Sequence, residues 1–598
     1  MRDALTSLAP HPRLFLAEAS LQQLRSDSRK DETLQRFADQ IVRNAEELLD
    51  ANELRYQKRG PRLLHVSREC LLRVQTLGIA WRWSGEERFA TRCRRDLMSV
   101  CGFADWNPSH FLDVAEMTHA VALGYDWLLP ILPDAERVAL RDAIVAKGLH
   151  PGLDCYRGKR AWWTKSAFNW NQVCNSGLLI GALAIAEHEP KLAEQIVASA
   201  VASLPIALAS YEPDGAWMEG PAYWGYATHY TAYGLDALRT ALGTDFGLSK
   251  RQGLQRAAWF PIYTAGPTGM FFNFADSREK SKRSPMPCVF WLARTYDENA
   301  FAAAEHDLLM SGKVRPMHLA WYEPPTAAPK SPKQTSTQKP RRRTAELARK
   351  FDGDVPVIVF RSEWDQPDAL FLAIKGGYNN VNHGHLDLGS FVLDALGVRW
   401  AVDLGSDDYN LPGYWRGGRN GKRWSYYRLG SHSHNVVTLD SQQQDPLGRA
   451  KVTAFSAERS HVVMDLHSAW PAANRARRGV QMVDRSVLVQ DEFLLEAASE
   501  LIWGMTTRAG ATVIDAGNTV RLRQDGKELL VRALAPKGAV WRTRSAERDP
   551  PEKRNQGVTR LELVVNARAG EIRIAVQLTP AWPEGSAPPP ELRPLSDW

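Results

Sequence analysis

Histidines and carboxylates crowd one short stretch of this 598-residue chain. In "NVNHGHLDLGSF" His383, His385 and Asp387 fall within five positions, and Asp403 follows at the end of the next apolar run. Residues two apart on a β-strand face the same side, so we expect the first three side chains to share one face. Such a group could transfer protons or hold a metal ion.

A second histidine pair, His432 and His434, stands directly before another apolar run in "GSHSHNVVTLD". Two histidines and a carboxylate form an ordinary zinc ligand set, and strand ends from one sandwich could bring them together. The competing interpretation is that these histidines are hydrogen-bonded core residues or caps. Because two such pairs occur in one half of the chain, we keep the metal site as a hypothesis.

The first half has a polar cluster of a different kind. The stretch "KSAFNWNQVCNSG" places Asn169, Asn171 and Asn175 ahead of an apolar helical pattern, with Trp170 among them. A helix cap explains one asparagine. Three of them beside tryptophan exceed what a cap requires.

Tyrosines follow in "YEPDGAWMEGPAYWGYATHY", where Glu219 precedes a predicted helix. Tyr223, Tyr226 and Tyr230 are spaced i, i+3 and i+7, which places them on one helical face. An aromatic stripe more often belongs to a core. This one carries hydroxyl groups beside tryptophans, which is typical of surfaces that stack on sugar rings.

Glu116 and His119 form a further polar pair, three residues apart between Trp106 and Trp127. The chain has 21 tryptophans, far more than expected at this length. Clefts lined by aromatic side chains suit carbohydrate.

The elements that must position these residues change in type along the chain. From residue 17 to about 320 the apolar spacing is helical, with short connections and no intervening strands. This pattern predicts paired antiparallel helices in an (α/α) bundle or toroid, over residues 1–322. Residues 323–345, rich in Pro, Lys, Ser and Thr, are predicted to be a linker or mobile loop. Residues 346–598 alternate with period two and predict an antiparallel β-sandwich of ten or more strands, giving an α+β, multidomain chain.

Composition excludes several classes of protein. The net charge of +7 is spread over 598 residues, and the chain has no dense basic stripe or recognisable module for nucleic acid. The six cysteines form no CxxC pair, which favours free buried thiols in a reducing compartment. We find neither a secretory leader nor an uninterrupted apolar run of about 18 residues, so we expect no membrane span and a cytoplasmic location, or a periplasmic one if a leader was removed.

Four motifs in this order carry a resemblance: "FNWNQVCNSG", "PDGAWMEGPAYWGY", "NHGHLDLGSF" and "HNVV". Together they resemble the heparinase II/III-like polysaccharide lyase family, which includes oligoalginate lyases, over residues 10 to 500. The resemblance implies an N-terminal (α/α) toroid, a C-terminal antiparallel β-sandwich and an active cleft between them. It also implies cleavage of a uronic-acid-containing poly- or oligosaccharide by β-elimination, which leaves a 4,5-unsaturated uronate end.

The resemblance assigns roles to individual residues. Asn169 matches the position that neutralises the substrate carboxylate, and Tyr223 matches the catalytic tyrosine, as acid toward the leaving oxygen and as a candidate base. His383 matches the histidine that acts as base or as a second carboxylate contact. The structural zinc ligands of some members correspond to His385, Asp403 and His434.

Further substrate contacts are expected from the polar and aromatic side chains already described and from arginines that could bind carboxylate or sulfate groups. The predicted substrate-binding residues are Asn171, Glu116, His119, Trp170, Glu219, Tyr226, Arg361, Arg416 and Arg423. For any one arginine, a solvated surface position is an equal alternative.

Two other function classes stay open. A glycoside hydrolase on the same toroid would use paired carboxylates such as Glu116, Asp214 or Glu219, but it would leave the Asn, Tyr and His cluster without a task. In a non-catalytic carbohydrate-binding protein the tryptophans would bind the sugar, and the Tyr and His side chains would only form hydrogen bonds. In each case the expected partner is an acidic saccharide, with no nucleic acid and no membrane, and a homodimer is left open.

Overall fold

The computed structural model describes residues 2–159, 161–325, 346–585 and 587–598. It divides into two compact units, and each is described by itself. The helical unit comprises Met1–Glu212, Gly225–Ala258 and Ser284–Thr335. The sandwich unit comprises Pro213–Trp224, Trp259–Arg283 and Ser336–Trp598, so two short segments from the helical half of the sequence pack with the strands. From residue 326 onward, the predicted linker lies outside the described residues.

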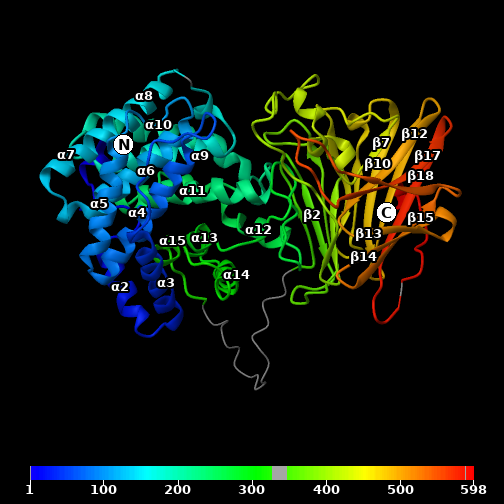
Figure 1. Ribbon diagram of the computed structural model, residues 1–598, viewed down its shortest axis with the longest axis horizontal. Coiled ribbons are helices and arrows are strands. Elements are labelled where there is room, and N and C mark those ends of the chain that lie inside the picture. Colours follow the sequence, from blue (N-terminus) through cyan, green and yellow to red (C-terminus); the bar gives the residue numbers. More distant parts are fainter. Residues whose placement is uncertain (1, 160, 326–345, 586) are drawn as a thin grey trace. The chain divides into compact units, whose positions relative to one another are not determined.

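Helices follow one another along this half of the sequence, as the apolar spacing predicts (Figure 1). The prediction of short connections is wrong in places, because residues 265–287 separate α12 from α13. Their bounds are α1 Arg2–Thr6, α2 Glu18–Ser28, α3 Glu32–Leu49, α4 Leu64–Ser84, α5 Glu87–Cys101, α6 Phe111–Leu128, α7 Asp134–Ala143, α8 His150–Tyr156, α9 Asn169–Ala184, α10 Pro190–Leu208, α11 Gly220–Leu242, α12 Trp259–Thr264, α13 Cys288–Tyr296, α14 Asn299–Leu309 and α15 Pro316–Ala320.

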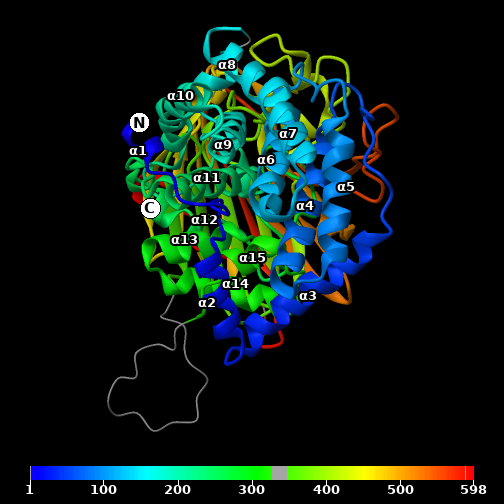
Figure 2. The same cartoon turned by 90° about the vertical axis from the view of Figure 1, so that its left-hand side faces the viewer.

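The helical unit has inner and outer helices. Every residue of α6 is buried, and α4 and α9 pack against it, as Figure 2 also shows. The outer helix α3 is amphipathic: its buried positions run from Leu34 and Phe37 to Ile41 and Ala45, and Asp31 caps its first turn by accepting from the Leu34 backbone N–H. Paired helices in two layers are the predicted (α/α) arrangement.

Two sequence predictions concern side chains and helices of this unit. All six cysteines are free thiols, as predicted, and five of them are buried. One helix, Pro190–Tyr211, has the length and a mean hydropathy of 1.6 that a membrane span would need, so the expectation of no span stays a prediction. Lys191 and Glu194 interrupt its apolar run near the start. The helix packs against α9, and length and composition are its only membrane-like features.

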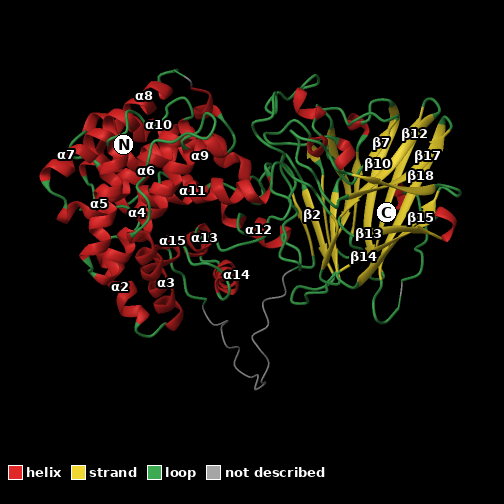
Figure 3. Cartoon of the chain, in the orientation of Figure 1, coloured by secondary structure: helices red, strands yellow, loops and turns green. Residues whose placement is uncertain are grey.

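The sandwich unit contains eighteen named strands, and all of their pairings are antiparallel within the described residues (Figure 3). Their bounds are β1 Ala348–Phe351, β2 Val357–Arg361, β3 Phe371–Lys375, β4 Gly377–Tyr378, β5 Phe391–Ala395, β6 Val398–Ala401, β7 Val437–Leu439, β8 Arg449–Ser456, β9 His461–Asp465, β10 Ala473–Val483, β11 Ser486–Leu495, β12 Ser499–Thr507, β13 Gly510–Ile514, β14 Thr519–Gln524, β15 Lys527–Ala535, β16 Val540–Ser545, β17 Thr559–Ala567 and β18 Gly570–Pro580. The predicted fold class, helices followed by an antiparallel sandwich, is confirmed.

These strands form three sheets. One has the order β1-β2-β3-β5-β6, the largest runs β13-β14-β15-β18-β11-β10-β9-β8-β4, and the third is β16-β17-β12-β7. Two-residue turns set the register of consecutive strands; Asp525 and Gly526 between β14 and β15 both have positive φ, as this hairpin turn requires.

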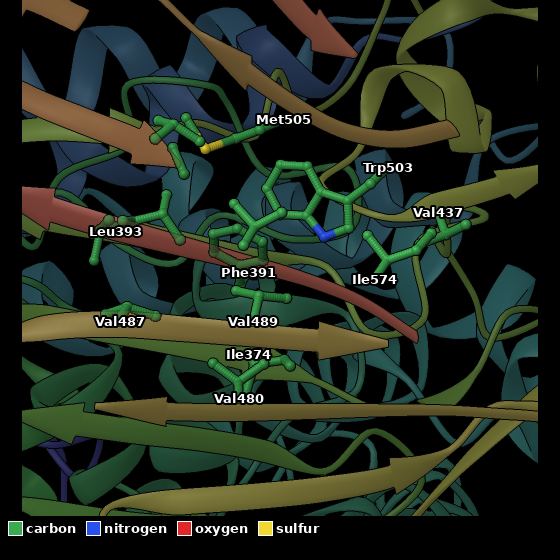
Figure 4. Packing of buried hydrophobic residues seen from close by; sticks show 14 of the residues in the cluster. Ile374, Phe391, Leu393, Val437, Val480, Val487, Val489, Trp503, Met505 and Ile574 are labelled. Carbon is green, nitrogen blue, oxygen red and sulfur yellow. The ribbon is translucent and has the colours of Figure 1, made fainter. Parts of the chain in front are cut away.

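A single apolar cluster fills the space between the sheets. Figure 4 shows Ile374 and Phe391 beside Val489, with Trp503 above them. Each of these side chains is fully buried and each comes from a different strand. The core fixes the strand ends, and the loops that leave those ends carry the polar residues described next.

Candidate active site

The Tyr223 ring lies flat against the His383 imidazole in the sandwich unit. The two ring centroids are 4.2 Å apart with an interplanar angle of 21°. Tyr223 comes from the first turn of α11, and its hydroxyl is 2.6 Å from the Tyr409 hydroxyl. Burial and the nearby Asp276 raise the pKa of Tyr409, so that phenol keeps its proton and can donate it in a hydrogen bond to the Tyr223 oxygen. This contact would stabilise a Tyr223 phenolate.

The buried carboxylate of Asp276 orients the His383 ring through a hydrogen bond to its Nδ1. Its Oδ2 is 2.7 Å from His383 Nδ1, and its Oδ1 is 3.0 Å from His385 Nε2. Tyr414 and Arg423 also donate to Oδ1, at 2.6 and 2.9 Å. Burial acts to raise the pKa of Asp276, but Arg423 and the two histidines hold it well below its usual range. A neutral His383 that donates from Nδ1 to this carboxylate presents Nε2 as a proton acceptor.

The expected strand geometry around these histidines is wrong. His383 and His385 lie in a loop between β4 and β5, and His383 has φ 60°, which no strand residue adopts. The same loop sends Asp387 away from them, to an ion pair with Lys375. The two histidines nevertheless lie close together, because each one hydrogen-bonds to the Asp276 carboxylate.

Glu219 completes the surroundings of His383. Its Oε1 is 3.8 Å from His383 Nε2 and accepts a hydrogen bond from Asn382, while Oε2 accepts from Trp217 at 3.1 Å. The Trp415 ring, 49% exposed, packs edge-on against His383 with centroids 5.3 Å apart. A carboxylate, a phenol and an exposed indole ring therefore lie around one imidazole.

His385, Asp403 and His434 gather as predicted for a metal site. All three are buried, and one ligand atom from each lies within 4.8 Å of the others. Asp403 follows β6 and His434 precedes β7, with 3.0 Å between Asp403 Oδ2 and His434 Nδ1. Burial acts to raise the pKa of Asp403, but His434 and His385 keep it lowered.

These residues fit a metal ion on their own chemistry. His385 Nδ1 and His434 Nε2 have no hydrogen-bond partner in the part of the chain that the structure describes. Buried polar atoms without partners are rare, and a cation would satisfy both. The carboxylate of Asp276 on the other nitrogen of His385 is the support that metal-bound histidines usually have.

The predicted substrate-binding arginines differ in exposure. Arg361 is buried and donates to the carbonyl oxygens of Tyr263 and Ala265. Arg423 is buried and donates to Asp276 and to the carbonyl of Gly384, so it supports the histidine loop. Arg416 is exposed, which leaves it accessible for an anionic ligand.

The three asparagines at the start of α9 belong to the helical unit. Asn171 Nδ2 donates to Ser203 Oγ of α10 at 3.0 Å and to the Thr164 carbonyl at 3.2 Å. Asn175 donates to the same Ser203 oxygen at 2.9 Å and accepts from Tyr156 at 2.7 Å. These two amides tie α9 to its neighbours, whereas Asn169 begins the helix and is 2% exposed.

Glu116 of α6 anchors a polar group in the helical unit. It accepts from Arg68 at 3.0 Å and from the Tyr226 hydroxyl, and the Arg68 guanidinium lies 4.6 Å from the Tyr226 ring centroid. Burial and Glu116 raise the pKa of Tyr226. His119 is fully buried against Tyr233, and burial lowers its pKa to about 3, so it is a neutral core residue near neutral pH.

Trp170 remains suited to stacking. Its ring centroid is 4.6 Å from that of Trp162, which is 51% exposed, and 4.9 Å from that of His110. The predicted roles of the helical-unit residues in binding substrate stay predictions, as does a joint site with Tyr223 and His383.

Sequence reasoning missed three residues of this site: Asp276, Tyr409 and Tyr414. Asp276 lies in "FFNFADSREK", where one carboxylate after an apolar run is an unremarkable loop residue. Its importance arises from tertiary contacts across more than a hundred positions. The two tyrosines lie in the polar stretch "DDYNLPGYW", whose aromatic content was the one available signal.

Comparison with known proteins agrees with this architecture. Residues 357–578 match the family model described as Heparinase II/III-like, C-terminal. A mutant of the heparan sulfate lyase HepC from Pedobacter heparinus is similar in structure, with a TM-score of 0.62 at 14% identity, covering 97% of this chain and 93% of that one. A heparinase III with methylated lysines gives a TM-score of 0.60 at 16% identity, covering 89% and 80%. At these identities the structures show the fold.

Curated sequences match over one short segment only. A stretch of 81 residues is 33% identical to a probable methylmalonate-semialdehyde/malonate-semialdehyde dehydrogenase of Drosophila pseudoobscura pseudoobscura. The match covers 14% of this chain, and the chain spans about 15% of the length of that relative. It carries no conclusion about fold or activity. The family model supports a narrower conclusion: residues 357–578 belong to the family described as Heparinase II/III-like, C-terminal, and the chain shares its fold with the two solved structures.

Proposed function

We propose that this protein is a polysaccharide lyase that cleaves a uronic-acid-containing poly- or oligosaccharide by β-elimination. The observation that carries the proposal is the contact between Tyr223 and His383, a phenol stacked on an imidazole that Asp276 orients. An elimination needs one side chain to accept a proton and another to donate one at neighbouring atoms of one sugar, and imidazole and phenol groups do both. The similar structures named for heparan sulfate lyase and heparinase activity support the same reaction class.

The reaction requires a base, a carboxylate contact and an acid. His383 Nε2 takes the proton from C5 of the uronate, and the electron pair forms the C4–C5 double bond as the bond from C4 to the bridging oxygen breaks. Tyr223 gives its proton to that leaving oxygen, with Tyr409 donating to the Tyr223 oxygen in turn. Negative charge grows on the sugar carboxylate as C5 loses its proton, and Asn169 is the proposed donor to it.

A zinc ion is the second part of the proposal. His385, Asp403 and His434 would hold it, and it would supply rigidity to the loop that carries His383 rather than a chemical step. Asp276 would then connect the two functions, because its two oxygens contact His383 and His385 separately.

A panel of uronate polymers tests the proposal: heparan sulfate, hyaluronan, chondroitin, alginate and glucuronan, each with oligosaccharides prepared from it. Elimination conjugates the new double bond with the carboxylate, so we expect ultraviolet absorbance to rise with at least one substrate. Reducing ends that appear without that absorbance would instead establish a hydrolase.

A further inference from the structure

A pocket of about 260 Å³ opens on the four-stranded sheet of the sandwich unit, and it shares no residue with the site around Asp276. Arginines dominate its lining, and the four are Arg542, Arg544, Arg548 and Arg560. Neighbouring residues on these strands, such as Leu561, Leu563 and Trp541, belong to the apolar core. Since side chains alternate along a strand, the arginines of β16 and β17 face away from the core.

The strand register places like charges opposite each other. β16 and β17 pair Arg542 with Glu562 and Arg544 with Arg560. Glu562 contacts Arg542 at 2.6 Å and Arg544 at 3.0 Å, so one carboxylate serves two guanidinium groups. Like charges directly opposite on neighbouring strands destabilise a sheet. Four arginines and one carboxylate, that of Glu562, line the pocket, so the pocket has an excess of positive charge that can bind an anion.

Arg560 is built into the floor of the pocket. It is 4% exposed and donates to the Thr506 hydroxyl at 3.2 Å and to the His434 carbonyl. The neighbouring strand leaves room for it at Gly504, where an added Cβ would come within 1.7 Å of Arg560 Nη2. The guanidinium is therefore held in place before any ligand arrives, which lowers the entropy lost on binding.

One phenol ring, that of Tyr427, lines the pocket beside these charges. The Arg548 guanidinium lies 3.7 Å from the Tyr427 ring centroid. A second hollow of about 220 Å³ includes Tyr427 and Arg548 as well as Trp424 and Tyr426, so the two hollows adjoin. Guanidinium groups next to aromatic faces match a sugar that carries a charge.

We propose that this pocket is a second binding site, which takes the carboxylate or sulfate group of an acidic saccharide with its sugar ring beside Tyr427 and Arg548. Its volume is near the lower end for ligand pockets, roughly 300 Å³, which suits one charged sugar unit of a longer chain. The choice of a saccharide rests on the proposed function, whereas the affinity for an anion rests on the pocket alone. A chain bound here would be retained by the protein between successive cleavages.

The test measures binding by calorimetry in the Tyr223→Phe protein, so that turnover does not consume the ligand. The probes are a sulfated heparin tetrasaccharide, an unsulfated tetraglucuronate and inorganic sulfate. The test variant adds Arg544→Ala and Arg548→Ala. The matched control adds Arg521→Ala and Arg523→Ala, which remove two arginines that share Glu528 on the opposite strand. Thermal melting verifies that both variants are folded.

We expect one tetrasaccharide binding event to weaken by roughly tenfold or more in the pocket variant and to persist in the control. The two tetrasaccharides show whether sulfate or carboxylate is preferred. Equal affinity in both variants would overturn the site, as would an equal loss in both. Binding of inorganic sulfate with neither tetrasaccharide would overturn the saccharide assignment. The readout is binding rather than turnover, so a failure of the lyase proposal cannot be mistaken for a failure of this one.

Discussion

The asparagines at the start of α9 have different proposed roles, and these roles predict how each variant fails. Asn171→Ala removes donors to Ser203 and Thr164 in a buried position, so it should cost about 1–3 kcal/mol of stability. Asn169→Ala should keep the melting temperature and lower turnover by roughly 10²-fold or more, as the loss of one donor to a developing charge does. Melting curves and initial rates separate the two. Full activity in Asn169→Ala would show that its amide is not the carboxylate contact.

His383 and His385 are two residues apart but should fail in different ways. His383→Ala should keep its metal and its melting temperature while turnover falls by about 10²–10⁴-fold, because a proton-transfer group is lost. His385→Ala should lose metal and melt earlier, because an ion bound only by the folded state stabilises that state. Elemental analysis should find about one zinc in the parent protein, and chelation should reproduce the earlier melting of His385→Ala. Equal losses of stability in both variants would contradict the division of roles.

At the scale of elements, the start of α11 sets the position of Tyr223. Gly220 has φ 82°, and an added Cβ would lie 2.8 Å from the Phe274 carbonyl oxygen, two residues before Asp276. Gly220→Ala should therefore lower stability by roughly 1–3 kcal/mol and also reduce turnover, since the helix start must move relative to His383. Gly243→Ala is the matched control, with φ 71° and open space around its Cβ. Equal activity in both variants would show that the contact with Phe274 does not position Tyr223.

A second element-scale prediction concerns the N-terminal segment, which His11 fastens to the helical unit through Asp126 of α6 and Glu187. Burial acts to lower the pKa of His11, but its hydrogen bonds to these carboxylates leave that pKa raised. The stabilisation from the charged ring is therefore fully present below about pH 6.5 and is lost as the pH rises through the folded-state value. The melting temperature of the parent should fall over that range, and His11→Gln should flatten the slope. The exposed His188→Gln is the control, and an unchanged slope in His11→Gln would refute the assignment.

Local periodicity was enough to predict the helices and strands, but it could not predict which of the two compact units each segment joins. The helical and alternating patterns gave the two halves correctly, because each reflects burial of one face. The segments around Tyr223 and Asp276 pack with the strands although they come from the helical half of the sequence, and no local pattern encodes that choice.

In the candidate site, too, local sequence patterns predicted some residues but not those that depend on tertiary contacts. His385, Asp403 and His434 were predictable because histidines and carboxylates at strand ends are recognisable ligands. Asp276, which contacts both His383 and His385, was not, because a loop carboxylate gains its meaning only from partners far away in sequence. The turn at His383, with its positive φ, also overrode the strand pattern.

At the scale of the whole molecule, the residues proposed for the reaction and those of the arginine pocket make separate predictions. Asn169 comes from the helical unit, whereas Tyr223 and His383 come from the sandwich unit, and the arginine pocket lies on the sandwich alone. The account therefore predicts that acidic saccharides can still bind when the chemistry is disabled, and that the bond is broken by elimination rather than by addition of water.

The most direct measurement is the mass of the new ends formed from a cleaved uronate oligosaccharide in water enriched in ¹⁸O. Elimination adds no water, so the account predicts an unsaturated uronate end without the heavy isotope, formed by the parent protein and not by Tyr223→Phe. A saturated product that carries ¹⁸O, or an unsaturated product formed equally fast by Tyr223→Phe, would contradict it.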